Sequence, residues 1–379
     1  MKTIAALLIG LTCLAASGAR ASEPIVIGVD LPLTGPASVI GHYLLWGVEI
    51  AFAEANAAGG VDGRPLKAMV LDDETKPEKA AENARRLIGE EKAVAVLGPA
   101  NSGNALAMIP VMQEAGKPLM LLTASATKLT RIHENEPRNY IFRATLPDRD
   151  QISFLVDWMA PRFKAVAIAC DTTPYGQLCR EDMVELMAAR GMKPAAIVTF
   201  PLGALDMAGE ARALAAANPD AVAILSLGNE VANFVRSADA IGFRPQFIGQ
   251  YPFFLQPVKE LPERLSNGLA GVLGSSPDAS AKASEIDGIV RARYLPEGYY
   301  PFKFVEAAYE GSMLVIQALR QARSLDGGAV RDALENMASF TGVANTFERP
   351  FAGKRHELYK AQNLYMGVWK DGRVVRLDQ

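Results

Sequence analysis

The chain has 379 residues, a formal net charge of −3 at pH 7, and 50% hydrophobic residues. This length is too great for one hydrophobic core and is sufficient for two domains, and the composition excludes a disordered or low-complexity protein. No basic stretch indicates a nucleic-acid partner.

The first residues predict a secretory leader. Lys2 precedes the apolar run Ile4–Ala16, and Ala19-Arg20-Ala21 provides a cleavage site, so we expect residues 1–21 to be removed and the mature protein to lie in the periplasm. The apolar run is shorter than the roughly 20 residues that a membrane span needs. Cys13 leaves a lipid-modified form as an alternative, although the residue before it is not one of the small residues expected there.

Short apolar runs alternate along the chain with longer segments whose apolar residues recur every three to four positions. The runs predict strands at Ile25–Val29, Leu66–Leu71, Val94–Leu97, Leu119–Leu122, Val166–Ala169, Ala195–Phe200, Ala221–Leu225 and Gln246–Ile248. The longer segments predict one-sided helices at Tyr43–Ala55, Pro77–Gly89, Asn104–Glu114, Gln151–Met159, Gln177–Arg190, Ala208–Ala217 and Asn229–Ile241. This alternation predicts an α/β fold with parallel sheets covered by helices on both faces. The alternation begins afresh after residues 143–147, which indicates a second lobe.

Cys170 and Cys179 remain after removal of the leader and flank a short loop. In an oxidising compartment such a pair is a disulfide candidate, and two buried free thiols are the equal alternative.

Motifs of enzymes and metal sites are missing from the sequence. There is no Gly-x-Ser-x-Gly, and the loop after the first strand, Asp30–Gly35, is not a dinucleotide-binding turn. His42, His133 and His356 are far apart, lack metal-ligand spacing, and are expected at the surface or in loops. We therefore expect no catalysis, no cofactor and no metal.

A series of short motifs follows in a specific order. They are Ile25–Val29, Thr34-Gly35-Pro36, Asn56–Arg64, Asp72–Pro77, Leu97-Gly98-Pro99 with Ser102, Pro118–Thr130, Tyr140–Arg143, Asp148–Gln151, Tyr175-Gly176, Asn218–Ala221 and Phe304–Met313. Together they resemble the periplasmic branched-chain amino-acid (Leu/Ile/Val) binding proteins, the substrate-binding components of ABC importers, over nearly the whole mature chain. The resemblance implies a type I periplasmic binding fold, with two doubly wound lobes joined by a three-strand hinge. It places residues 22–146 and 277–343 in lobe 1, and 147–276 and 344–379 in lobe 2.

The resemblance also implies a ligand-binding site between the lobes. A ligand carboxylate would be held by a hydroxyl and backbone amides after the third strand, at Ala100, Asn101 and Ser102, and one strand later at Ala124 and Ser125. Amides that begin a helix favour an anion. Thr127 is the alternative to Ser125, and a plain helix cap is the alternative role for Ser102. The expected apolar lining is Ile40, Tyr175, Leu227, Tyr251 and Phe304, whereas Trp46 is expected to face the core of lobe 1.

One position departs from the family's pattern. Tyr251 stands where the family's amino-acid binders carry an acid that holds the ligand's ammonium. Asp148 and Glu230 are candidate substitutes, although a hinge-side cap and a solvent-facing helix start are the expected roles. We therefore expect the ligand to be either a branched-chain amino-acid-like solute or an apolar or aromatic carboxylate.

The resemblance thus predicts a monomeric solute-binding protein that serves an ABC permease in the inner membrane. The alternative is a periplasmic sensing protein that presents its ligand to a receptor or regulator, since one fold serves both uses.

Overall fold

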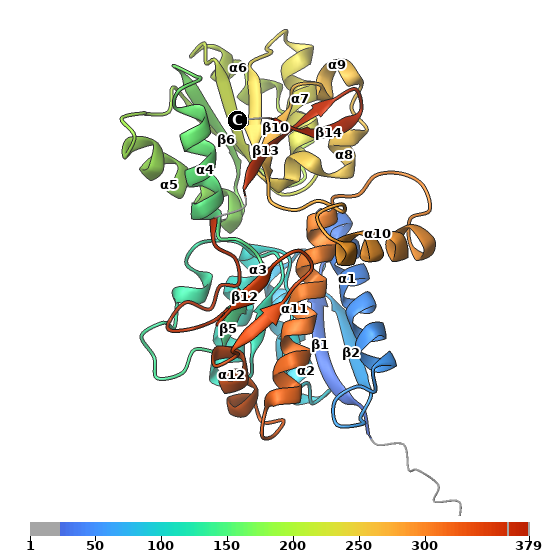
Figure 1. Cartoon of the computed structure of the whole chain (residues 1–379). Coiled ribbons are helices and arrows are strands. Elements are labelled where there is room, and N and C mark those ends of the chain that lie inside the picture. Colours follow the sequence, from blue (N-terminus) through green and yellow to red (C-terminus); the bar gives the residue numbers. More distant parts are fainter. Residues whose placement is uncertain (1–22, 362–363, 378–379) are drawn as a thin grey trace, which may run out of the picture.

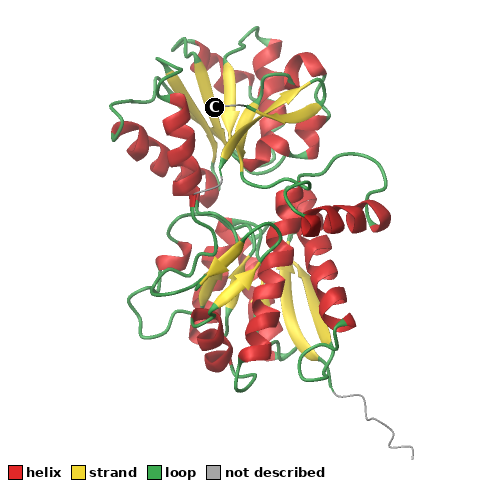
Figure 2. Ribbon diagram, in the orientation of Figure 1, coloured by secondary structure: helices red, strands yellow, loops and turns green. Residues whose placement is uncertain are grey.

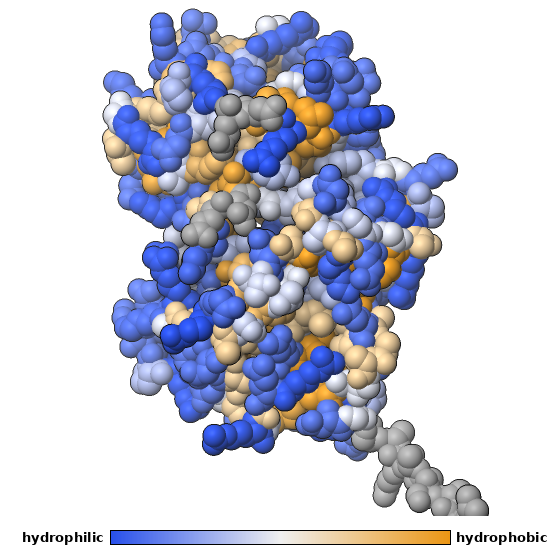
Figure 3. All heavy atoms as spheres, in the orientation of Figure 1, coloured by the Kyte–Doolittle hydropathy of each residue, from blue (hydrophilic) through white to orange (hydrophobic). Residues whose placement is uncertain are grey.

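The computed structural model describes residues 23–361 and 364–377, and it shows two lobes stacked end to end (Figure 1). The predicted leader lies outside the described residues. Within them, no helix combines the length and the hydrophobicity needed to cross a membrane. Helices cover the sheets of both lobes (Figure 2), and hydrophilic residues dominate the visible surface (Figure 3).

The sheet of lobe 1 is parallel and has the order β2-β1-β3-β4-β5. Its strands are β1 (Ile25–Leu31), β2 (Leu66–Asp72), β3 (Val96–Leu97), β4 (Leu119–Leu121) and β5 (Ile141–Arg143). The helices associated with this lobe are α1 (Ser38–Ala57), α2 (Pro77–Gly89), α3 (Ser102–Glu114), η1 (Leu129–Arg131), α10 (Ala281–Arg293), α11 (Phe302–Gln321) and α12 (Gly327–Glu335). Strands covered on both faces must be apolar nearly throughout, which explains the continuous apolar runs.

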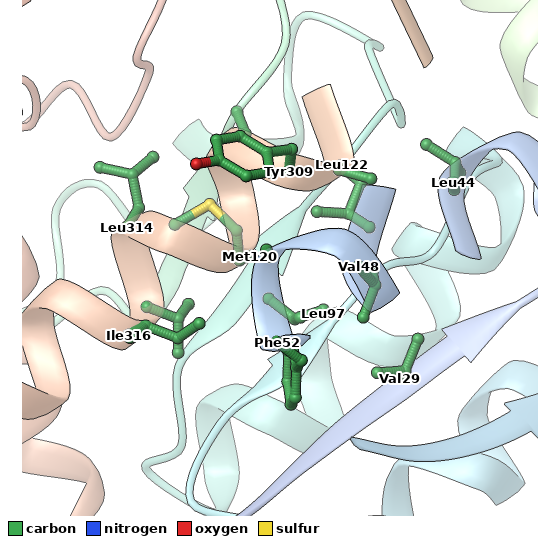
Figure 4. Close-up of a cluster of buried hydrophobic side chains, with 14 of the residues drawn as sticks. Val29, Leu44, Val48, Phe52, Leu97, Met120, Leu122, Tyr309, Leu314 and Ile316 are labelled. Carbon is green, nitrogen blue, oxygen red and sulfur yellow. The ribbon is translucent and has the colours of Figure 1, made fainter. Parts of the chain in front are cut away.

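Alternate residues of β1 separate the two faces of this sheet. Ile27 and Val29 pack with α1 and α11, whereas Val26 packs with α2 and α3. Figure 4 shows part of the cluster that β1 forms with α1 and α11, including Val29 beneath Val48 of α1. Gly47 permits the close approach of these helices, because a Cβ there would lie 2.3 Å from the carbonyl oxygen of Val305 in α11.

The sheet of lobe 2 has the order β14-β13-β10-β9-β8-β6-β7. Its strands are β6 (Val166–Asp171), β7 (Ile197–Phe200), β8 (Ala221–Leu225), β9 (Gln246–Gly249), β10 (Ala270–Leu273), β13 (Tyr365–Lys370) and β14 (Arg373–Arg376). Its helices are α4 (Asp148–Met159), α5 (Pro174–Ala188), α6 (Ala208–Ala215), α7 (Glu230–Ala240), η2 (Tyr251–Phe254), α8 (Gln256–Lys259) and α9 (Glu263–Ser266). β13 and β14 are antiparallel to their neighbours, so the expectation of purely parallel sheets is wrong at this edge.

The predicted strands correspond to β1 to β4 and β6 to β9, and the predicted helices to α1 to α7, which confirms the α/β class. The chain passes from lobe 1 to lobe 2 between β5 and α4, and returns between β10 and α10 (Figure 1).

The last passage into lobe 2 lies later than residues 343–344, where it was expected. The hairpin of β11 (Ser339–Thr341) and β12 (Thr346–Glu348) is followed by Phe351 and Leu358, which are buried in the core of lobe 1. The amide of Leu358 also donates to the carbonyl of Arg143 at the end of β5 (3.0 Å). The segment up to Leu358 therefore belongs to lobe 1, because its apolar side chains and its backbone are both satisfied there.

Burial bears on two further expectations. Cys170 and Cys179 are buried free thiols, so the candidate disulfide is not formed. Desolvation raises the pKa of Cys170 to about 11. His356 lies in a loop, as expected, but it is buried: it is 1% exposed and stacks on Phe142 with ring centres 4.1 Å apart. Across the described ranges, no group of three or more His, Cys, Asp or Glu side chains could hold a metal ion.

Candidate functional site

A cavity lies between the two lobes, at the carboxyl ends of the strands of both sheets. Its empty space is about 520 Å³, counting the part that opens to solvent. Loops beyond the carboxyl ends of parallel strands are the usual ligand sites of α/β proteins. The lining residues are Ile40, Ala100, Ser102, Thr123, Ser125, Thr145, Asp148, Gln151, Tyr175, Leu227, Gln250, Tyr251, Pro252, Lys303 and Phe304.

Ser102 is the first residue of α3 and lies directly after the loop that follows β3. Its Oγ accepts a hydrogen bond from the amide of Ala126 (3.1 Å), and its own proton remains available to donate. The first amides of a helix have no partner within the helix, and they carry a partial positive charge. The start of α3 and the Ser102 hydroxyl are therefore suited to a carboxylate. Asn101 stands at the cap position of α3, so Ser102 is not the helix cap that the alternative required.

Ser125 lies in the loop after β4 and also lines the cavity. Its carbonyl accepts from the guanidinium of Arg143 (2.9 Å) and from the amide of Asp148 (2.8 Å), which fixes the loop. Thr127, the alternative to Ser125, is engaged elsewhere because its hydroxyl donates to Asp182 of α5 (2.7 Å).

Two predicted ligand residues do not line the cavity. Ala124 packs in the cluster formed by α2, α3 and the sheet. Asn101 is 3% exposed, and its side-chain amide has no hydrogen-bond partner among the described residues. The other predicted positions do line it: Ala100, Ser102, Ser125, Ile40, Tyr175, Leu227, Tyr251 and Phe304.

Three polar side chains joined by hydrogen bonds form one part of the wall that lobe 2 contributes. The hydroxyl of Tyr175 donates to Oε1 of Gln250 (2.9 Å), and Nε2 of Gln250 donates to Oδ1 of Asp148 (3.0 Å). Sequence reasoning missed Gln250, although it stands directly after β9, where a ligand-contacting residue is expected.

The two candidate acids are both buried, and for Glu230 this corrects the expected solvent-facing helix start. Asp148 begins α4 and lines the cavity, and burial raises the pKa of its carboxyl group, whose Oδ2 has no hydrogen-bond partner among the described residues. Glu230 begins α7 but is 1% exposed, and its Oε1 accepts from the amide of Gly203 (2.6 Å). Desolvation raises the pKa of Glu230 to about 7. Glu230 is not among the lining residues, so Asp148 is the acid within reach of a ligand.

Lys303 is a second residue that the sequence analysis missed. It lies in the first turn of α11, is 4% exposed and lines the cavity beside Phe304. Its ammonium pairs with Glu306 (3.1 Å) and lies 3.9 Å from the centre of the Tyr359 ring. The motif that begins at Phe304 marked this helix, but a single lysine ahead of an apolar run gives no signal of burial.

The two lobes touch around the cavity. Leu178 of α5 packs against the α2 and α3 cluster of lobe 1, and Tyr251 of lobe 2 packs against the α1 and α11 cluster. The hydrogen bond from Thr127 to Asp182 joins the lobes a short distance away. The cavity therefore lies where the two lobes are in contact.

A protein with this fold and an interlobe cavity of this kind is a solute-binding protein of the type I periplasmic class. The family model described as periplasmic binding protein matches residues 24–373, and the chain belongs to this family. The family binds small-molecule solutes outside the cytoplasm and works with ABC permeases.

Known proteins of the same kind are similar to this chain over most of its length. The Leu/Ile/Val-binding protein homolog 2 of Brucella abortus (strain 2308) is 27% identical over 335 residues, which cover 88% of both chains. A periplasmic binding protein type 1 from Bordetella pertussis Tohama I matches with a TM-score of 0.85 and 26% identity, over 94% of this chain and 100% of that one. An ABC transporter solute-binding protein of Rhodopseudomonas palustris BisB5, solved with 3,4-dihydroxybenzoic acid, matches in fold with a TM-score of 0.81 and 20% identity, over 93% of this chain and 96% of that one.

Proposed function

We propose that the protein is the extracytoplasmic solute-binding component of an ABC importer and holds a small carboxylate between its lobes. The observation that carries this proposal is the set of donors on one wall of the cavity: the Ser102 hydroxyl, Ser125 and the start of α3. Neutral donors at a helix start favour an anion.

An apolar or aromatic acid is the ligand that this cavity fits best. Its wall includes Ile40, Leu227, Tyr251, Pro252 and Phe304, and no carboxylate follows β9, where the amino-acid binders of the family carry one. A buried ammonium without a partner is costly, so this wall favours a solute whose body carries no charge. The aromatic acid bound by the Rhodopseudomonas palustris protein supports the same class of ligand.

A branched-chain amino acid is the second candidate, because Asp148 lines the cavity with one carboxylate oxygen unpartnered among the described residues. A ligand ammonium beside Asp148 would favour the ionised form and lower its pKa, which burial raises. The Brucella abortus relative is named a Leu/Ile/Val-binding protein homolog, which agrees with this candidate.

A thermal-shift panel on refolded protein spanning residues 22–379 tests both candidates. Benzoate and 4-methylpentanoate represent the apolar acids, and leucine, isoleucine and valine represent the amino acids. A ligand at a thousand times its dissociation constant stabilises the protein by about 4 kcal/mol, which raises the melting temperature by several degrees. A shift with the apolar acids supports the first candidate. A shift with the amino acids alone, lost in Asp148→Asn, supports the second, and no shift with any of these acids contradicts the proposal.

Lobe closure is the mechanism that links binding to transport. A ligand held by both lobes favours the closed form by its differential contacts, and the closed form is what a permease would recognise. Deletion of the gene should abolish uptake of the bound solute. Unchanged uptake with a lost transcriptional response would instead favour the sensing role. Light scattering with and without ligand tests the expected monomer.

A further inference from the structure

Lys303 is a buried lysine in the wall of the cavity, where a positive charge is unfavourable unless other groups stabilise it. The Lys303 side chain is almost fully buried in the first turn of α11, where the partial positive charge of the helix start disfavours a cation. Burying a charge is costly unless it is paired. Glu306 and the Tyr359 ring offset this cost. Among the described residues, the ammonium donates a hydrogen bond to Glu306 alone.

The ammonium therefore retains donor capacity, and Lys303 is one of the residues that line the cavity. A lysine ammonium carries three N–H donors, and one of them serves Glu306 at 3.1 Å. Lys303 also acts on Tyr251 across the cavity: burial raises the pKa of the Tyr251 hydroxyl to about 12, and the nearby lysine charge opposes that rise. The lysine thus lies between the two lobes, beside the aromatic side chains that would enclose the body of a solute.

Two buried acids already lie near the charge of Lys303. Glu306 is 1% exposed and Glu310, one turn further along α11, is 0% exposed. The Oε1 of Glu310 accepts from the amide of Val343 (2.8 Å), and its Oε2 accepts from the hydroxyl of Tyr359. A second carboxylate on the solute would join these two acids and one lysine, which like-charge repulsion disfavours. An uncharged oxygen would accept from the lysine without this penalty.

We propose that Lys303 is a specificity-determining residue, and that it selects solutes carrying an uncharged oxygen acceptor, a hydroxyl or a carbonyl, on their apolar body in addition to the carboxylate. This inference rests on the proposed function, because it assumes that the carboxylate is held by Ser102 and the start of α3. Lys303 then supplies the donor for the second oxygen.

Calorimetric titration of refolded protein with matched acids tests this role. The probes are 3- and 4-hydroxybenzoate, the 3- and 4-methylbenzoates of nearly equal size, and benzene-1,4-dicarboxylate. We expect one hydroxybenzoate to bind about 10- to 100-fold more tightly than the methylbenzoate substituted at the same position. Lys303→Met should remove this preference and leave the affinity for the methylbenzoates within about threefold. The dicarboxylate should bind more weakly than the preferred hydroxybenzoate.

Two further variants separate specificity from folding. Because Lys303→Met leaves Glu306 buried without its partner, the double variant Lys303→Met/Glu306→Gln should show the same loss of preference with a restored melting temperature. Lys282→Met is the matched control, since Lys282 also pairs with carboxylates in lobe 1 and lies 5.7 Å from the centre of the Tyr309 ring, outside the cavity lining. It should leave the preference unchanged.

Several outcomes would overturn the inference. Equal loss of hydroxy and methyl acids in Lys303→Met would mean that the lysine holds the carboxylate itself. A preference that survives in Lys303→Met and disappears in Asp148→Asn would assign the second oxygen to the polar chain of lobe 2. Tightest binding of the dicarboxylate would refute the charge argument. Binding of none of these acids, with binding of leucine intact, would refute the inference and leave solute binding itself standing.

Discussion

Replacement of Ser102 by alanine is the substitution that bears most directly on the proposed carboxylate site. The Ser102 side chain is 1% exposed and accepts from the amide of Ala126 at 3.1 Å, and in the proposed site its proton donates to the ligand. Alanine removes both hydrogen bonds without adding volume. The Ala126 amide would be left buried without its partner, and the ligand carboxylate would lose one donor.

The two losses appear in different measurements. A hydrogen bond to a charged group contributes about 1.5–3 kcal/mol, so the dissociation constant for the best acid of the panel should rise roughly 10- to 150-fold by calorimetric titration. An unsatisfied buried amide costs about 1–3 kcal/mol, which should lower the free energy of unfolding measured with urea.

Ser237→Ala provides the matched control for this variant. Its hydroxyl accepts from the amide of Met207 at 3.0 Å, the same kind of bond, and Ser237 lies in lobe 2 outside the cavity lining. We expect Ser237→Ala to destabilise the fold similarly and to leave affinity unchanged. If Ser102→Ala loses stability but binds the acid as tightly as the wild type, Ser102 does not hold the carboxylate.

Three further substitutions test closure, pH dependence and packing. Thr127→Val removes the hydrogen bond to Asp182 that joins the lobes, so it should weaken ligand binding about 2- to 10-fold by calorimetry, by lowering the closed population without touching the ligand. The pKa of Glu230 is about 7 in the folded protein against an ordinary 4.5, so the folded state binds this proton more tightly than the unfolded state. The free energy of unfolding is therefore highest below pH 4.5 and falls as the pH rises through 7. Glu230→Gln should therefore match the wild type near pH 4.5 and exceed it by about 1–3 kcal/mol at pH 8 in urea unfolding. Gly47→Ala should lower stability by about 1–3 kcal/mol, because the new methyl group would lie 2.3 Å from the Val305 carbonyl oxygen.

Each of these expectations has a contrary result. Unchanged affinity in Thr127→Val would mean that this bond does not bias closure. A stability difference between the wild type and Glu230→Gln that is constant from pH 4.5 to 8 would show that the carboxyl group does not titrate in this range. A Gly47→Ala protein as stable as the wild type would mean that α1 and α11 separate without cost.

The regular part of the fold could be predicted because its signals are local. Buried parallel strands appear as continuous apolar runs, as in Ile25–Val29, and covering helices repeat their apolar residues every three to four positions. The edge strand β14 was missed because it mixes polar and apolar residues over Arg373–Arg376. The last passage between the lobes was misplaced because Phe351 and Leu358 are isolated apolar residues in a polar segment.

The candidate site could be predicted only where a motif marks it. Ser102 and Ser125 follow strands in recognisable loops, and the structure places both in the cavity wall. Lys303, Gln250 and Asp148 are polar residues whose burial depends on the packing of distant segments, and neither composition nor periodicity carries that information. Sequence reasoning therefore located the part of the wall that carries Ser102 and Ser125, named Asp148 as a candidate, and missed Lys303 and Gln250.

A crystal structure of the protein with the best acid of the panel tests the central claim most directly. We expect closed lobes with the acid between them and a carboxylate oxygen within about 2.6–3.2 Å of the Ser102 Oγ. An acid bound outside the cavity, or bound there with its carboxylate turned away from Ser102 and the start of α3, would contradict it.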